Sequence, residues 1–167
     1  DCPLWIDSYR CAFRKRVGSA SERTLTGAII PPKTSHIATV ISLMFKNTKH
    51  LLEFTGITSS LTLDFYIKTT GCADIYPTNL NSFPLGIDSK YLNELIPRVL
   101  LLNRVNKAYT QLWNSNFEDS YKNCRWSIKD ERLKPFSTLE AIWNSKTPLR
   151  NYFERRYALV EIDVITA

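Results

Sequence analysis

The sequence predicts an α+β fold with a strand-rich N-terminal half and a helical C-terminal half. Residues from about 8 to 45 alternate apolar and polar side chains and are rich in β-branched residues, which is typical of strands. From Asp88 onward, apolar residues recur every three or four positions, as in amphipathic helices. We therefore expect two portions, a strand-rich one at residues 1–87 and a helical one at residues 88–167.

The first two strands are expected at residues 9–14 and 24–30, paired as a hairpin. In the first strand Cys11 and Phe13 fall on one face and the arginines on the other, because strand side chains alternate. We expect Cys11 and Phe13 to face the core. The second strand ends at a double proline, which cannot continue a central ladder.

The rest of the N-terminal half is predicted to hold one more strand and one helix. The β-branched run at residues 36–43 indicates the strand. Apolar residues at helical spacing favour a helix near residues 57–69, although the threonines and serines there disfavour a helix interior. Gly71 suits a left-handed cap at its end. Residues 73–86, with two prolines, are expected to form a loop or a short edge strand.

The C-terminal half is predicted to contain one long helix and a final amphipathic helix. The long helix spans residues 88–112, and Pro97 either starts or kinks it. Ser137 with Glu140 resembles a capping box that would start another helix. Thr147, followed by a proline, is expected to cap the final helix.

Composition indicates a globular protein with a preference for polyanions. The 167 residues are 44% hydrophobic and 23% charged, and the net charge is +6. Such an excess favours a polyanionic partner. The sequence has no apolar run of transmembrane length, so we expect no membrane partner. Its four cysteines show no disulfide framework, which disfavours secretion.

No recognisable catalytic or metal-binding motif is present. The sequence has neither a Gly-x-Gly-x-x-Gly turn nor a phosphate-binding lysine loop, and it has two histidines and no Cys-x-x-Cys pair. The carboxylates that we considered for DNA cleavage are scattered along the chain: Asp64, Asp74, Asp88, Glu161 and Asp163. We therefore expect no catalytic residue, no metal site and no cofactor in this chain.

The candidate chemistry is recognition of a polyanion by cations around short polar loops. Cations can hold a phosphate backbone while small donors approach it, and arginine can read guanine. The alternative is an edge hairpin that carries solubilising charge. The candidate DNA-contacting residues are Arg10, Arg14, Lys15, Arg16, Ser19, Ser21 and Arg23 in the hairpin, Lys33, Thr34, Ser35 and His36 after the double proline, and Lys68, Thr69 and Thr70 before Gly71.

Three segments of the chain carry a family resemblance. Arg-Cys-Ala-Phe-Arg at 10–14, Ser-Glu-Arg-Thr-Leu at 21–25 and Ala-Ile-Ile-Pro-Pro at 28–32 form the first. Residues 63–71 with 79–85 form the second, and residues 155–163 the third. In this order they resemble the C-terminal target-recognition region of type IIG-like fused restriction–modification enzymes, which are adenine-specific DNA methyltransferases.

The resemblance implies a non-catalytic fragment that recognises a specific duplex DNA sequence. Its partners would be double-stranded DNA and the methyltransferase domain of the same parent chain, in a bacterial cytoplasm. The Asn-Pro-Pro-aromatic motif that such methylases use to hold adenine is absent, so S-adenosylmethionine would bind the parent's methylase domain only. The chain starts at Asp1 without methionine, and we expect it to be an excised piece of a longer protein.

Two alternatives remain open from the sequence. The chain could be a structural or protein-docking segment of the same enzyme, with base readout elsewhere. It could also be a small nuclease domain, which the scattered carboxylates disfavour.

Overall fold

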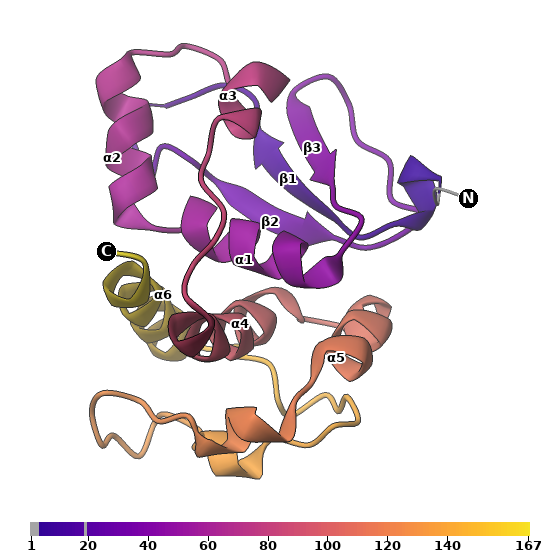
Figure 1. Cartoon of the computed structure of the whole chain (residues 1–167), viewed down its shortest axis with the longest axis vertical. Coiled ribbons are helices and arrows are strands. Elements are labelled where there is room, and N and C mark those ends of the chain that lie inside the picture. The colour runs from indigo at the N-terminus through magenta and orange to yellow at the C-terminus, as the bar shows by residue number, and fades with distance from the viewer. Residues whose placement is uncertain (1–3, 19) are drawn as a thin grey trace.

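The computed structural model describes residues 4–18 and 20–167 and confirms the α+β class. A three-stranded antiparallel sheet lies in the N-terminal half, and helices make up the C-terminal half (Figure 1). The strands are β1 (Arg10–Arg14), β2 (Gly27–Ile30) and β3 (Val40–Met44), in the order β2-β1-β3.

The predicted hairpin is confirmed, and its two inward residues are in place. Cys11 pairs with Ile29 across the antiparallel β1–β2 ladder, and both Cys11 and Phe13 are buried. The second strand starts at Gly27, later than predicted. The backbone N–H groups of Thr24 and Leu25 donate to the Asp64 carboxylate instead of to a strand, at 2.5 and 2.7 Å.

The third strand begins at Val40, and the prediction of a strand from residue 36 was wrong at its start. Both β2 and β3 run antiparallel to β1, on its two sides, so the connection at residues 31–39 must cross the sheet. It crosses the face opposite to Cys11 and Phe13, which we call the outer face. There His36 bonds Ser42 of β3.

Three helices follow the sheet: α1 (Thr48–Thr58), α2 (Leu61–Thr70) and the short α3 (Pro77–Asn81). The helix predicted near residues 57–69 corresponds to α2, but its start was wrong because the chain breaks at Ser60. The Ser60 hydroxyl accepts a hydrogen bond from the N–H of Leu63 and so starts α2. Gly71 adopts the predicted left-handed cap, with φ 66°.

The C-terminal half contains α4 (Ser89–Asn103), α5 (Thr110–Asn116) and α6 (Tyr152–Thr166). The single helix predicted at 88–112 was wrong: Pro97 lies inside α4, and Asn106 caps a separate turn that leads into α5. Short 3-10 turns complete the chain, at Trp5–Asp7, Lys107–Tyr109, Asp119–Asn123 and Phe136–Thr138.

The two helix starts predicted near the C-terminus were wrong. Ser137 lies within a 3-10 turn that is followed by extended backbone, and no helix begins there. The final helix starts after Asn151, not after Thr147. The Asn151 side chain accepts from the N–H of Glu154, and the Glu154 carboxylate accepts in return from the N–H of Asn151.

One hydrophobic core extends through both portions of the chain. Helix α1 lies between the sheet and the helices α4 and α6 (Figure 1). Phe54 of α1 packs edge-on against Phe13 of the sheet, and Gly56 lies against Leu95 of α4. Among the residues described, no helix is long and apolar enough to cross a membrane.

Candidate nucleic-acid interface

Three consecutive cations follow the end of β1, and we call Arg14, Lys15 and Arg16 the basic tip. Arg14 and Arg16 are exposed and Lys15 is half-buried. The Arg14 Nε donates to the Arg16 carbonyl at 2.9 Å, and the Lys15 N–H donates to the Thr39 carbonyl at 2.8 Å. Within residues 4–18 and 20–167 none of the three forms an ion pair. Their charge is therefore available to a ligand.

The segment at residues 73–76 pairs with the basic tip. The Ile75 N–H donates to the Lys15 carbonyl at 2.8 Å, and the Val17 N–H donates to the Ala73 carbonyl at 2.9 Å. This places the Lys15 ammonium 5.1 Å from the ring centroid of Tyr76. Sequence reasoning missed Tyr76, because no local pattern indicates that this loop would lie beside β1.

The loop between β1 and β2 lies against the basic tip. A Cβ added to Gly18 would be 2.6 Å from the Arg14 Nη2, so the guanidinium lies directly over this glycine. The Ser21 N–H donates to the Gly18 carbonyl, and the Ser21 carbonyl accepts from the Lys68 ammonium at 3.4 Å. The structure thus brings Arg14, Ser21 and Lys68 together. Ser19 lies outside the described residues.

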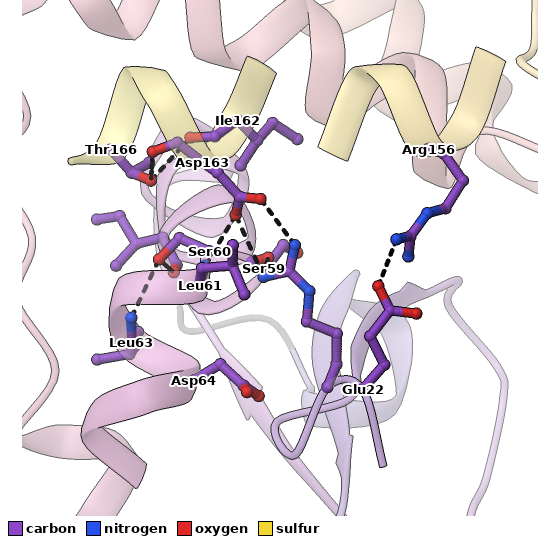
Figure 2. A network of polar contacts seen from close by, with 12 residues as sticks. Glu22, Ser59, Ser60, Leu61, Leu63, Asp64, Arg156, Ile162, Asp163 and Thr166 are labelled. Atoms are coloured by element: carbon purple, nitrogen blue, oxygen red, sulfur yellow. Dashed lines mark hydrogen bonds and ion pairs between the residues drawn. The ribbon is translucent and has the colours of Figure 1, made fainter. Parts of the chain in front are cut away.

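Arg23 is engaged within the protein, so its charge is less available to DNA than that of the basic tip. Its guanidinium donates to both carboxylate oxygens of Asp163 in α6, at 3.2 and 2.8 Å, and to the carbonyl of Ser59. Its side chain is 19% exposed. Figure 2 shows Asp163 facing the turn at Ser59 and Leu61, while Arg156 reaches Glu22.

The two contacts between this loop and α6, Arg23–Asp163 and Glu22–Arg156, are called here the loop–α6 ion pairs. The hydrogen bond from Arg156 holds the pKa of the Glu22 carboxyl below its ordinary value. The ion pairs join the predicted DNA-contacting hairpin to the last helix of the chain. They fix the loop, so its cations are not all free for a ligand.

Arg10 is fully buried, so its guanidinium is not accessible to DNA in this structure. Its guanidinium lies 3.7 Å from the Trp5 ring centroid and donates to the carbonyls of Ser8 and Thr34. Burial lowers the pKa of the Arg10 guanidinium. The crossing connection at residues 31–39 covers this end of the outer face, and the side-chain alternation of β1 does not reveal it.

The polar loop after the double proline is only partly available. Lys33 is exposed, has a positive φ of 60°, and donates its N–H to the Ile6 carbonyl at 2.6 Å. Ser35 is also exposed. The His36 Nε2 and the Ser42 hydroxyl share a hydrogen bond of 2.9 Å, and the carbonyl of Thr34 accepts from the buried arginine. This loop packs over the Arg10 end of β1, whereas the basic tip follows the other end.

The third predicted group lies at the end of α2 and is exposed but internally bonded. Lys68 pairs with the Asp64 carboxylate at 3.3 Å. The hydroxyls of Thr69 and Thr70 donate to the carbonyls of Tyr66 and Ile67, both at 2.8 Å. These bonds belong to the last turn of the helix, and of the three residues only Lys68 bonds the loop between β1 and β2, at the carbonyls of Ser21 and Glu22.

The carboxylates considered for cleavage include three that hold the fold together. Asp64 binds the N–H groups before β2, and Asp163 binds Arg23. Glu161 pairs with the buried Arg98 at 2.7 Å. Among the described residues, no three His, Cys, Asp or Glu side chains gather as a metal site would require.

No protein-family model matches this chain, and neither a curated protein nor a solved structure does. The proposal below rests on the geometry of the basic tip and on the motif resemblance.

Proposed function

We propose that this chain is a non-catalytic module that binds duplex DNA through its basic tip. The observation that carries the proposal is the run of Arg14, Lys15 and Arg16, which are at least partly exposed and form no ion pair within the described residues. Most other candidate cations are buried or paired. Phosphate groups are contacted mainly by such arginines and lysines, with small polar groups beside them.

The neighbourhood of the basic tip suits a phosphate backbone. Ser21 supplies an exposed polar group beside the cations, because its N–H donates to the Gly18 carbonyl and Gly18 lies under the Arg14 guanidinium. The sheet and the hydrogen bonds of residues 73–75 fix the backbone of the tip. A fixed backbone lowers the entropy lost when the side chains bind.

The motif resemblance supports a place for this module in a restriction–modification DNA methyltransferase. Its partners would then be double-stranded DNA and the methyltransferase domain of the parent chain, in the cytoplasm. S-adenosylmethionine would bind that domain and not this chain. The chain by itself would neither methylate nor cleave DNA, with or without magnesium and methyl donor.

Duplex binding by matched variants tests the proposal. One variant replaces Arg14, Lys15 and Arg16 with alanine, and the control replaces Lys107, Arg125 and Lys129, which are exposed in the helical half. Fluorescence anisotropy with a labelled duplex should show at least about a tenfold weaker affinity for the first variant only, because each lost phosphate contact weakens binding at physiological salt. Equal losses in both variants, or no binding by the unaltered chain, would overturn the proposal.

Protein docking is a second candidate function, and an exposed apolar surface favours it. Leu61 and Phe65 of α2 are 52% and 68% exposed, and Val160 and Val164 of α6 are 51% and 74% exposed. The two helices meet where the Leu61 N–H donates to Asp163. Neighbouring exposed apolar residues are typical of interaction sites.

Docking on this surface is testable separately from DNA binding. The double substitution Phe65→Ser with Val164→Ser should leave the DNA affinity unchanged. It should weaken association with the methyltransferase domain of the parent, measured by light scattering of the mixed proteins. Unchanged association would remove this candidate.

A further inference from the structure

We propose that Tyr76 is a stacking platform for an unpaired nucleotide at the edge of the basic tip. This inference rests on the proposed DNA binding and adds a ligand class to it. The site would take a nucleotide outside the duplex stack, such as one at a gap or at a strand end. The ring would hold the base and the tip would hold the adjoining phosphates.

The position of Tyr76 is fixed although its side chain is 50% exposed. Its N–H donates to the Asn79 side chain at 2.9 Å, at the start of α3. The preceding residue, Ile75, is fully buried and bonds the Lys15 carbonyl at 2.8 Å. An exposed ring on a fixed backbone can stack on a ligand with little loss of conformational entropy.

The charge around the ring is arranged for a nucleotide. The Lys15 ammonium lies 5.1 Å from the ring centroid, over one face. Since half of the side chain is exposed, a base could stack on the accessible part of the ring. Arg16 follows in the chain and is exposed, so a phosphate attached to the stacked nucleoside would meet a free cation. Aromatic rings beside cations are the usual elements of sites for single-stranded nucleic acids.

The requirement for an unpaired nucleotide follows from the structure of a duplex. In B-form DNA the faces of the bases are covered by their neighbours, and only the base edges face the grooves. A tyrosine ring can therefore stack only where a base has left the helix or where the stack ends. Tyr76 would make no stacking contact with an intact duplex that binds the tip by its phosphates alone.

A matched tyrosine in the same chain provides the control. Tyr91 is also 50% exposed, and the Lys90 ammonium lies 5.4 Å from its ring centroid. It lies at the start of α4, outside the basic tip. Substitution of Tyr91 thus removes an equivalent ring and lysine contact without removing the proposed platform.

The test compares an intact duplex with a duplex that carries a one-nucleotide flap of 2-aminopurine. We expect the unaltered chain to bind the flapped duplex more tightly and to quench the 2-aminopurine fluorescence. Tyr76→Ala should lose about 5- to 150-fold of the affinity for the flapped duplex, the range reported for base–aromatic stacking. It should leave intact-duplex binding within about twofold, because phosphate contacts remain.

One conservative variant and one control variant separate stacking from other roles of Tyr76. Tyr76→Phe should retain flap binding and quenching, and Tyr91→Ala should change neither. Equal binding of flapped and intact duplexes by the unaltered chain would overturn the platform while the proposed function stands. Loss of flap binding in Tyr76→Phe would assign the effect to the hydroxyl and also overturn stacking. If neither DNA binds, the proposed function itself fails.

Discussion

Among the residues that the structure describes, Arg104 is the side chain whose burial is least compensated. It is fully buried, and none of its three guanidinium nitrogens has a hydrogen-bond partner among the described residues. The guanidinium lies 3.3 Å from the ring centroid of Trp113. Burial lowers the pKa of Arg104 to about 9. The cation–π contact offsets only part of the desolvation of the charge.

Replacement of this arginine by an apolar side chain should stabilise the fold. We expect Arg104→Met to raise the free energy of unfolding by about 1–3 kcal/mol at pH 7, because an unpaired buried charge is removed. Because its pKa is lower in the folded state, the cost of Arg104 is full below pH 9 and falls as the pH rises above 9. The gain should therefore shrink at alkaline pH, as measured by urea unfolding.

Arg98 provides the control for this substitution. It is equally buried but pairs with Glu161, so Arg98→Met would leave a carboxylate in the core without its partner. We expect that variant to lose about 3–5 kcal/mol. A loss of similar size in Arg104→Met would show that the Trp113 contact outweighs the desolvation.

At the scale of the helices, the close approach of α1 and α4 depends on Gly56. A Cβ at this position would lie 2.8 Å from carbon atoms of the Leu95 side chain. We expect Gly56→Ala to destabilise the protein by about 1–3 kcal/mol through overpacking, in spite of the better helix propensity of alanine. Thermal unfolding would measure it. The added substitution Leu95→Val should recover part of the loss, and a stabilised Gly56→Ala variant would contradict the packing described.

Hydrophobic alternation predicted the strand β1 and its inward residues. Side chains alternate along a strand, so the apolar Cys11 and Phe13 fall on the same face, and this face is buried. The same reasoning failed where a single polar side chain decides an end. Ser60 and Asn106 interrupt apolar periodicity that continues on both sides. Periodicity reports which face is buried, whereas a cap depends on one hydrogen bond.

The candidate site was predictable only as a group of cations near the β1–β2 loop. Which cations remain free depends on partners far along the chain. Arg23 bonds Asp163, and Arg10 is covered by the connection at residues 31–39. Neither relation leaves a local sequence signal. The sequence therefore predicted the cations of the basic tip together with Arg10 and Arg23. Only the structure shows that these two arginines are buried or paired, whereas the basic tip is not.

At the scale of the whole molecule, the loop–α6 ion pairs join the β1–β2 loop of the N-terminal half to the last helix. A double-mutant cycle with Arg23→Ala and Asp163→Asn should give a coupling energy of about 1–3 kcal/mol, since the contact is bidentate and largely shielded from water. Urea unfolding would measure it. The same cycle for Arg132 and Asp130, in which the arginine side chain is 64% exposed, should give a smaller coupling energy. Equal coupling energies would contradict the structural role of the contact.

The salt dependence of duplex binding tests the central claim most directly. Each phosphate contact contributes about 0.9 to the slope of log affinity against log salt. We expect Arg14→Ala to lower the magnitude of this slope by about 0.9 relative to the unaltered chain. Arg23→Ala should change stability but not the slope, because Asp163 already holds that guanidinium. A slope that falls with Arg23→Ala and not with Arg14→Ala would contradict the assignment of the basic tip as the DNA-binding surface.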